Sequence, residues 1–332
     1  MSFTDVNARR LERERRRRAR ARRRRLVAVG SLAGIVVIVA AVAIASAGGG
    51  PATKPRKGAA GSSGKRTASH HATSPSAPRP AASLSQQQGS GVPGNATVPI
   101  LMYHVINPPP AGAPFPGLYV PADEFAAQME ALKAAGWHAV TMDQLRANWT
   151  RGVPLGPGKP VVITFDNGYE SQYTNALPVL RRLGWVGVEN IQLTGLPPSQ
   201  GGLSDSQVKA LVGAGWELDT QGMSHADLIK LDAAGLQYQI DNARQLLRSR
   251  YGVPVNWFCY PSGHYNATVI AAVRAAGFVG STTVVPGWAS RSDDPYALPR
   301  LRVLGGTSAS ALLQQIASVQ SSAPPPSAYG SD

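Results

Sequence analysis

The stretch VVITFDNG at residues 161–168 decides the fold class. It is an apolar run typical of a strand, and it leads directly into an acid, an amide and a glycine. Further short apolar runs predict strands, and segments with helical periodicity lie between them. Strands alternating with helices of about 10–18 residues predict an α/β sheet or a distorted (β/α) barrel. The expected strands are 99–103, 161–165, 186–191, 217–218 and 255–260. The expected helices are 122–135, 172–182, 205–214, 233–250 and 267–276. Glycines at 136, 184, 215 and 277 close four of these helices.

The basic charge of the chain lies outside this alternating region. The formal net charge is +14, yet residues 1–25 alone hold twelve arginines against three acids. Residues 48–96 add six basic residues and no acid, so the remainder of the chain is close to neutral. A nucleic-acid-binding domain carries its basic excess on a folded face, and this pattern therefore argues against nucleic acid as a partner.

An uncharged stretch follows the arginine block. Residues 26–47, from Leu26 to Ala47, are rich in Val, Ile and Ala. As a helix they would reach about 33 Å, enough to cross the hydrocarbon core of a bilayer. The preceding arginines predict a cytoplasmic N-terminus, which makes the protein a single-pass cell-membrane protein with its main domain outside. The alternative is secretion after cleavage at Ala47, because Ala45-Ser46-Ala47 forms an A-x-A site.

Composition sets the remaining boundaries. Residues 48–96 consist mostly of Gly, Ser, Pro, Ala and Lys, and predict a disordered linker because they cannot bury enough apolar surface. The alternating region at 97–320 is the expected folded domain, and 321–332 is the expected loose tail. The single cysteine, Cys259, excludes an intramolecular disulfide and is expected to be a small buried side chain.

Polar and titratable residues gather where several of these strands end. The relevant stretches are 100–104, 161–168, 216–225 and 257–264. In a barrel the carboxyl ends of the strands meet at one mouth, so these side chains are expected to share a site. Trp288, in a Pro- and Gly-flanked segment, is expected to form an exposed platform beside it.

The motifs in these stretches resemble those of the NodB-type polysaccharide deacetylases, which remove N-acetyl groups from amino sugars. The family's TFDDG motif is TFDNG here, so Asp166 matches the general base and Asn167 stands where a metal ligand is expected. The family's H-x-x-x-H motif is similar to QGMSH at 221–225, which places Gln221 and His225 at the two other ligand positions.

The third motif of the family, Arg-x-Pro-Tyr-Gly-like, is similar to CYPSG at 259–263. The resemblance implies that this segment contacts the substrate and its oxyanion, and the family's arginine is replaced by Cys259. The sequence therefore predicts a base that lacks its arginine partner. The segment consists of Tyr260, Pro261, Ser262 and Gly263.

The opening strand resembles a permuted branch of the same family. The run LMYH at 101–104 is similar to the N-terminal motif of that branch, in which a histidine serves as general acid. His104 is the matching residue, and the alternative is a histidine that only caps a loop. The C-terminal histidine motif of other members is absent, since LLQQ at 312–315 carries no imidazole.

The amides at 167 and 221 weaken the expected metal site. The resemblance implies a divalent cofactor, zinc or a similar cation, which would polarise the acetyl carbonyl and acidify a water. Asn167 and Gln221 offer neutral oxygens where a carboxylate and an imidazole suit zinc. The site is expected to bind metal weakly or not at all.

A relocated ligand set is the alternative. Asp219 lies two residues before Gln221, so both would face the same side of a continuous strand. His264 follows the third motif at the same rim. Asp219, His225 and His264 could then hold the metal together.

The sequence thus predicts a membrane-anchored, extracytoplasmic deacetylase-like enzyme that acts on cell-envelope polysaccharide with a degenerate metal site. Two alternatives remain open: an inactive carbohydrate-binding pseudoenzyme, and a structural or interaction protein of the envelope. The sequence identifies neither the polysaccharide nor the oligomeric state.

Overall fold

Nine strands form one mixed sheet in residues 89–194, 196 and 201–320, which are the residues that the computed structural model describes. These residues belong to one compact unit, Ser74–Asp332. The strands are β1 (Val98–Tyr103), β2 (Trp137–Val140), β3 (Lys159–Asn167), β4 (Val188–Ile191), β5 (Glu217–Thr220), β6 (Trp257–Cys259), β7 (Gly280–Thr282), β8 (Trp288–Ala289) and β9 (Leu301–Arg302).

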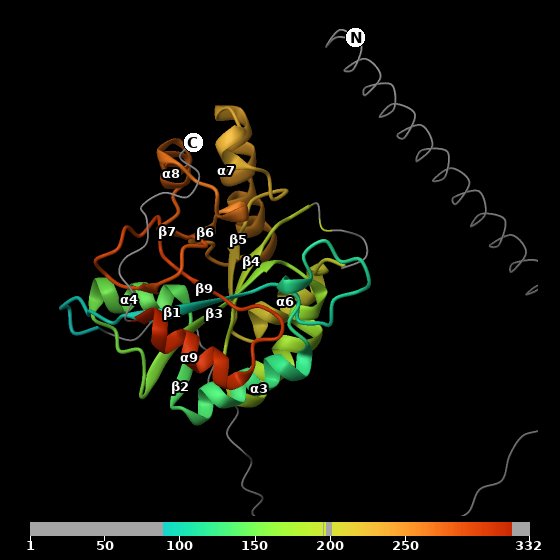
Figure 1. Ribbon diagram of the computed structural model, residues 1–332. Helices are drawn as coiled ribbons and strands as arrows, with labels where there is room; N and C mark the ends of the chain where they lie inside the picture. Colours follow the sequence, from blue (N-terminus) through green and yellow to red (C-terminus); the bar gives the residue numbers. More distant parts are fainter. Residues whose placement is uncertain (1–88, 195, 197–200, 321–332) are drawn as a thin grey trace, which may run out of the picture. The chain divides into compact units, whose positions relative to one another are not determined.

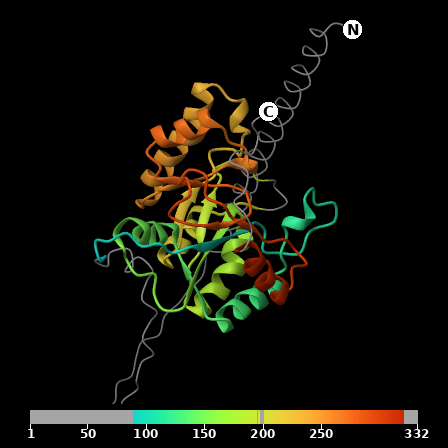
Figure 2. The ribbon, with the colours of Figure 1, turned by 60° about the vertical axis from the view of Figure 1, so that its left-hand side comes forward.

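The sheet is curled, and helices pack around it (Figures 1 and 2). Its order is β7-β6-β5-β4-β3-β1-β8, with β2 also paired to β3 and β9 also paired to β1. The pairs are parallel except for β1 with β8. The segment from Leu298 to Arg302 contacts both β7 and β1, because Leu298 bridges Thr282 of β7 and β9 pairs with β1. The α/β class is confirmed, and the barrel is a curled half-barrel bridged by this short segment.

Helices follow most strands. They are α3 (Ala122–Ala134), α4 (Met142–Arg151), α5 (Leu177–Leu183), α6 (Asp205–Gly213), α7 (Ala233–Tyr251), α8 (Ala267–Ala275) and α9 (Ala309–Gln320). Short 3₁₀ or π turns are η1 (Pro116–Leu118), η2 (Gln172–Ala176), η3 (Leu228–Lys230) and η4 (Pro261–Gly263).

Alternation along the strands divides the core into an inner and an outer layer. On β3, Ile163 and Phe165 face outward to a cluster shared with α3, α5 and α9. Val162 faces the opposite way, into a cluster with Ile100, Val188 and Trp257. A third cluster lies between β5 and β6 and helices α7 and α8.

Every strand and helix that the sequence predicts is present, and its ends differ from the predicted ones by a few residues. Missed elements are β2, α4, β7, β8, β9 and α9. The α4 helix had a readable start, because the Thr141 hydroxyl and the Gln144 side chain form a capping box. The strands β8 and β9 are two residues long and have no pattern of their own.

The expected membrane segment at 26–47, the tail at 321–332 and most of the linker at 48–96 lie outside the described residues. Among the residues that are described, none of the helices has the length and apolar character that a membrane crossing requires.

Candidate active site

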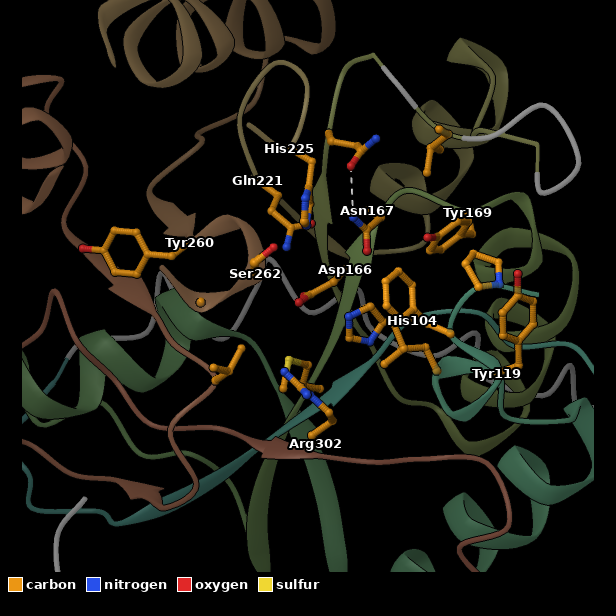
Figure 3. A pocket seen from close by; sticks show the side chains of 18 of the residues that line it. His104, Tyr119, Asp166, Asn167, Tyr169, Gln221, His225, Tyr260, Ser262 and Arg302 are labelled. Atoms are coloured by element: carbon orange, nitrogen blue, oxygen red, sulfur yellow. Dashed lines mark hydrogen bonds between the residues drawn. The ribbon is translucent and has the colours of Figure 1, made fainter. Parts of the chain in front are cut away.

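A cavity of about 560 Å³ lies where the parallel strands end. Residues at the carboxyl ends of β1, β3 and β5, or directly after them, reach it, as expected for chemistry at the carboxyl mouth of such a sheet. Figure 3 shows His225 and Gln221 on one side, Asp166 and His104 in the middle, and Arg302 on the opposite side. The sequence placed Asp166, His104, Asn167, Gln221 and His225 in one site, and the structure brings all five to this cavity.

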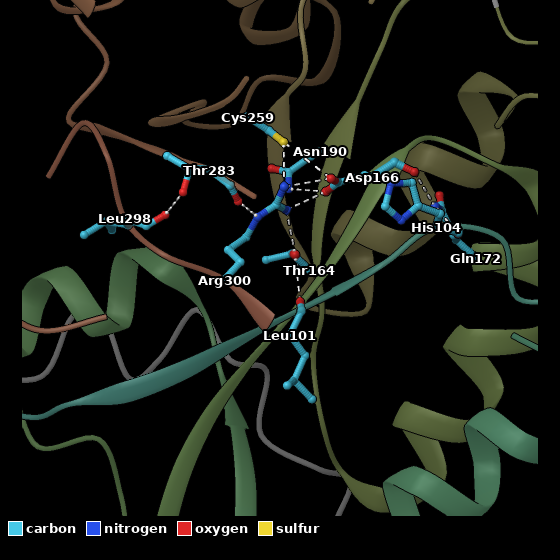
Figure 4. A network of polar contacts seen from close by, with 10 residues as sticks. All are labelled: Leu101, His104, Thr164, Asp166, Gln172, Asn190, Cys259, Thr283, Leu298 and Arg300. Atoms are coloured by element: carbon cyan, nitrogen blue, oxygen red, sulfur yellow. Dashed lines mark hydrogen bonds and ion pairs between the residues drawn. The ribbon is translucent and has the colours of Figure 1, made fainter. Parts of the chain in front are cut away.

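Asp166 is held by a buried arginine that the sequence did not predict. Asp166 Oδ1 lies 2.8 Å from Nη1 of Arg300, and Oδ2 lies 2.9 Å from Nη2. Both side chains are 1% exposed. Asn190 donates a further hydrogen bond to Oδ1 at 2.9 Å. This network appears in Figure 4.

All five N–H donors of Arg300 have partners. Besides the two bonds to Asp166, Nε donates to the carbonyl of Thr283, and the remaining donors reach Thr164 Oγ1 and Cys259 Sγ. Five satisfied donors in a fixed plane make the guanidinium a rigid clamp. The expectation that the base lacks an arginine is therefore wrong.

Arg300 supplies the arginine that is missing at Cys259. Cys259 stands where the family motif has its arginine, and its small side chain leaves room for Arg300 at 3.2 Å from Sγ. Arg300 lies 41 residues later, in the bridging segment before β9. No spacing rule links it to Asp166, so no pattern in the sequence indicates this contact.

The ion pair with Arg300 keeps Asp166 in its charged form. Burial raises the pKa of Asp166, but the positive charge and hydrogen bonds of Arg300 outweigh it and leave a pKa of about 2. The negative charge beside it raises the pKa of Arg300 despite its burial. Asp166 is therefore ionised at neutral pH.

His104 follows β1 and is 9% exposed. Burial lowers its pKa to about 4, although the charge of Asp166 acts in the opposite direction. Its Nδ1 has no hydrogen-bond partner among the described residues. The buried amide of Gln172 donates 2.8 Å hydrogen bonds to the backbone carbonyls of both His104 and Asp166. Gln172 thus holds the two predicted catalytic residues at a fixed separation.

Asn167, Gln221 and His225 line the cavity together, so the predicted ligand positions converge. Gln221 Oε1 is buried and has no partner among the described residues, which leaves an acceptor available. Asn167 donates from Nδ2 to Gln192 Oε1 at 3.0 Å. Burial lowers the pKa of His225, which favours the neutral imidazole.

This donor set fits zinc poorly. It offers two neutral amide oxygens and one imidazole, without the anionic or second imidazole ligand that zinc sites use. The charge of Asp166 is already compensated by Arg300, which donates a hydrogen bond to each of its oxygens.

Backbone strain is concentrated at the same cavity. In the described residues, three non-glycine residues have φ in the left-handed region: Asn167 at 79°, His225 at 54° and Ser262 at 57°. All three line the cavity. Such conformations cost energy and persist where surrounding structure imposes them, often at functional sites.

The third motif reaches the cavity in part. Tyr260, Ser262 and Gly263 line it, and Pro261 is buried beneath them. The Tyr260 hydroxyl donates to the carbonyl of Tyr296 at 2.8 Å and is thereby turned away from a role with substrate. Ser262 is exposed and is the residue of this motif with a free path to a ligand.

The relocated ligand set is not assembled. Asp219 Oδ1 accepts the backbone N–H groups of Asn256 and Trp257, at 3.0 and 2.8 Å, at the start of β6. His264 Nδ1 lies 3.1 Å from Asp227. Neither Asp219 nor His264 lines the cavity, and the described residues contain no cluster of three His, Cys, Asp or Glu side chains suited to a metal ion.

The aromatic rim also differs from expectation. Trp288 donates from its indole to the carbonyl of Ile316 and packs against Trp137, with ring centroids 5.8 Å apart. It is therefore part of the packing and not a platform. Phe115, which sequence reasoning missed, lines the cavity and is 68% exposed.

Known proteins are similar to this chain in sequence and in fold. The sequence profile of the polysaccharide deacetylases matches residues 155–281. YxkH of Bacillus subtilis (strain 168), provisionally named a polysaccharide deacetylase, is 31% identical over 226 residues, or 68% of this chain and 78% of that protein. The poly-beta-1,6-N-acetyl-D-glucosamine N-deacetylase of Escherichia coli (strain K12) is 25% identical over 58% of this chain, a region that spans 35% of the enzyme.

A solved structure agrees. Streptococcus pyogenes deacetylase PplD in complex with acetate matches with a TM-score of 0.61 at 25% identity, over 67% of this chain and 98% of that one. Fold and cavity together are those of a polysaccharide deacetylase-like domain. With YxkH covered over more than three quarters of its length, the chain belongs to the polysaccharide deacetylase family of the NodB type.

Proposed function

We propose that this protein is an N-deacetylase of amino-sugar polymers of the cell envelope, weakened by Asn167 and Gln221. The observation that carries the proposal is the convergence of Asp166, clamped by Arg300, and His104 on one open cavity. The E. coli relative is named for acetyl removal from a polymer of N-acetylglucosamine, which supports this class of substrate. The run LMYH before the loop supports membership of the permuted branch.

In the proposed reaction, water adds to the acetyl carbonyl carbon and Asp166 accepts its proton. The bond from carbon to nitrogen then breaks, His104 in its protonated form gives a proton to the leaving amine, and acetate remains. Transfer of the proton from Asp166 back to His104 completes the cycle. Because the pKa of Asp166 is lowered to about 2, its uptake of a proton from water is unfavourable, and because the pKa of His104 is lowered to about 4, little of it carries a proton at neutral pH. No step is assigned to a metal, since the donor set fits one poorly.

A carbohydrate-binding protein without catalysis is the second candidate. The neutral amides favour it, because Gln221 Oε1 is a buried acceptor that an acetamide N–H could satisfy. A structural role in the envelope is the third possibility, and would leave the cavity idle.

Restoring the family's ligands tests the proposal. We expect the full-length protein after dialysis to hold well under one equivalent of zinc by elemental analysis. The double change Asn167→Asp with Gln221→His should raise zinc binding, and acetate release from N-acetylglucosamine oligomers should appear or increase. Adding Asp166→Ala should abolish the restored activity, while Asp219→Ala should leave zinc content unchanged.

Two results would contradict the interpretation that the metal site is degenerate. One is a full equivalent of zinc in the unmodified protein. The other is a fully active unmodified protein that loses activity in the double variant. If neither protein releases acetate but both bind the oligomers, the carbohydrate-binding alternative is supported.

The proposed location is the outer side of the cell membrane, with residues 26–47 as the anchor. It rests on the arginine block and the uncharged stretch of the sequence.

A further inference from the structure

The cavity carries a second arginine whose charge is not neutralised. Arg302 is exposed and lines the cavity, whereas Arg300 is buried beneath it. The two alternate with Leu301 and Val303, which pack outward into the cluster that includes Leu101. The extended backbone of this segment therefore directs both guanidinium groups to the inner side.

The position of Arg302 is fixed by its backbone. Arg302 pairs with Met102 of β1, two residues before His104. Its carbonyl accepts a 3.1 Å hydrogen bond from the side chain of Gln315 on α9. Arg302 and His104 line the same cavity (Figure 3), and the positive charge of Arg302 is a minor cause, after burial, of the lowered pKa of His104.

The other cavity residues leave this charge uncompensated. Asp166 is the one carboxylate among the described residues that line the cavity, and Arg300 occupies both of its oxygens. Arg302 takes part in no ion pair within the described part of the chain. His104 and His225, the two histidines of the lining, carry no negative charge in either protonation state. The cavity therefore has a net positive charge at Arg302.

We infer that Arg302 selects an anionic polysaccharide, with a carboxylate or phosphate substituent on or next to the N-acetylated sugar. A guanidinium binds either group through paired, charge-assisted hydrogen bonds, and gains little from a neutral sugar hydroxyl. The inference rests on the proposed function, because it names the substrate class of the same site.

Binding measurements with matched oligosaccharides test the inference. The probes are a neutral N-acetylglucosamine oligomer, an oligomer of the same length with lactyl ether carboxylates on alternate sugars, and one with glycerol phosphate substituents. Isothermal titration of the full-length protein should give about tenfold tighter binding to at least one anionic probe than to the neutral one at low salt. The carboxylate and phosphate arms identify which anion is recognised.

In the Arg302→Gln variant the ratio of anionic to neutral affinity should fall to about one, and Arg302→Lys should retain part of it. Arg291→Gln is the matched control, since Arg291 is exposed but does not line the cavity. Its ratio should equal that of the unmodified protein.

Equal affinity of the unmodified protein for all three probes would overturn the inference, and so would an undiminished ratio in Arg302→Gln. The first comparison needs no variant, so it decides the matter even if Arg302→Gln fails to fold. Acetate release from the same probes reports on the proposed function separately. Anion-selective binding without acetate release would retain the inference and reject the deacetylase.

Discussion

At the scale of single residues, the contact between Asp166 and Arg300 dominates the site. The pair is buried, and each charge has the other as its main partner. Burying two charges is costly, but removing one partner costs more, because the remaining charge is left without compensation. The pair therefore explains both the ionised state of Asp166 and the sensitivity expected at this position.

Replacing Arg300 should strongly destabilise the protein. We expect Arg300→Met to lower the free energy of unfolding by about 3–5 kcal/mol and to abolish acetate release. The double variant Arg300→Met with Asp166→Asn should be more stable than Arg300→Met alone. Chemical denaturation measures these differences. The control is Arg182→Gln, which breaks an exposed pair with Glu130 and should cost less than about 1 kcal/mol. Similar losses in Arg300→Met and Arg182→Gln would contradict the clamp.

His104 should make stability depend on pH. Its pKa falls from 6.5 in the unfolded chain to about 4 in the fold. Between these values the unfolded state binds the proton and the folded state does not, so stability is lost as the pH falls from 6.5 to 4. The expected loss from this group is about 3 kcal/mol. Denaturation at pH 7 and at pH near 4 should show that His104→Gln removes this part.

The His264→Gln variant is the matched control, since His264 pairs with Asp227 outside the cavity. It should retain the part of the pH dependence that belongs to His104. Asp166 acts at lower pH: its pKa is depressed from 3.8 to about 2, so its contribution is lost as the pH falls below about 4. An unchanged pH dependence in His104→Gln would show that the histidine is not buried as described.

At the scale of elements, the ends of the strands decide what the site contains. At the end of β3, Asn167 and the following Gly168 lie in the left-handed region, at φ of 79° and 85°. Glycine adopts this region freely and asparagine adopts it more readily than most residues. The turn directs Asp166 toward Arg300 while Asn167 faces Gln192.

Gly168 should not tolerate a side chain. A Cβ at this position would lie 2.7 Å from Cγ1 of Ile191. Gly184 offers a matched comparison, because its φ is 71° and nothing lies within 4 Å of an added Cβ. We expect Gly184→Ala to cost about 1 kcal/mol for the backbone alone, and Gly168→Ala to cost at least about 1 kcal/mol more for the collision. Urea denaturation would measure the difference, and equal costs would mean that β4 yields to the methyl group.

At the scale of the whole molecule, the charge is distributed unevenly along the chain. Residues 1–25 carry the arginine block, residues 48–96 hold six further basic residues, and the nearly neutral remainder holds the folded domain. The uncharged stretch at 26–47 lies between them, outside the described residues. We propose that this stretch is a membrane anchor and that the domain faces the envelope.

Protease treatment of intact cells would test the anchor. The folded domain should be removed and the N-terminal tail should be protected, because positively charged flanks stay in the cytoplasm. An antibody tag on each end, followed by immunoblotting, gives the readout, and permeabilised cells serve as the control. Recovery of a mature protein that begins at Gly48 would instead support secretion.

The sequence by itself determined the features that depend on neighbours along the chain. Alternation of apolar strands and helices gave the α/β class, and the strand-end motifs placed Asp166, His104, Asn167, Gln221 and His225 at one mouth. These succeed because parallel strands have a common direction, so their ends meet wherever the strands pair. The same local logic failed for Asp219, since a strand's alternation does not say which neighbouring backbone will meet the side chain.

Only the tertiary structure decided which distant groups meet. Arg300 replaces the arginine missing at Cys259, Arg302 lines the cavity above it, and Trp288 packs inward while Phe115 stays exposed. The bridging segment from Leu298 to Arg302 carries both arginines, yet its strand is two residues long and has no period to read. Its place is set by closure of the curled sheet between β7 and β1, and closure depends on the whole sheet and not on the residues that complete it.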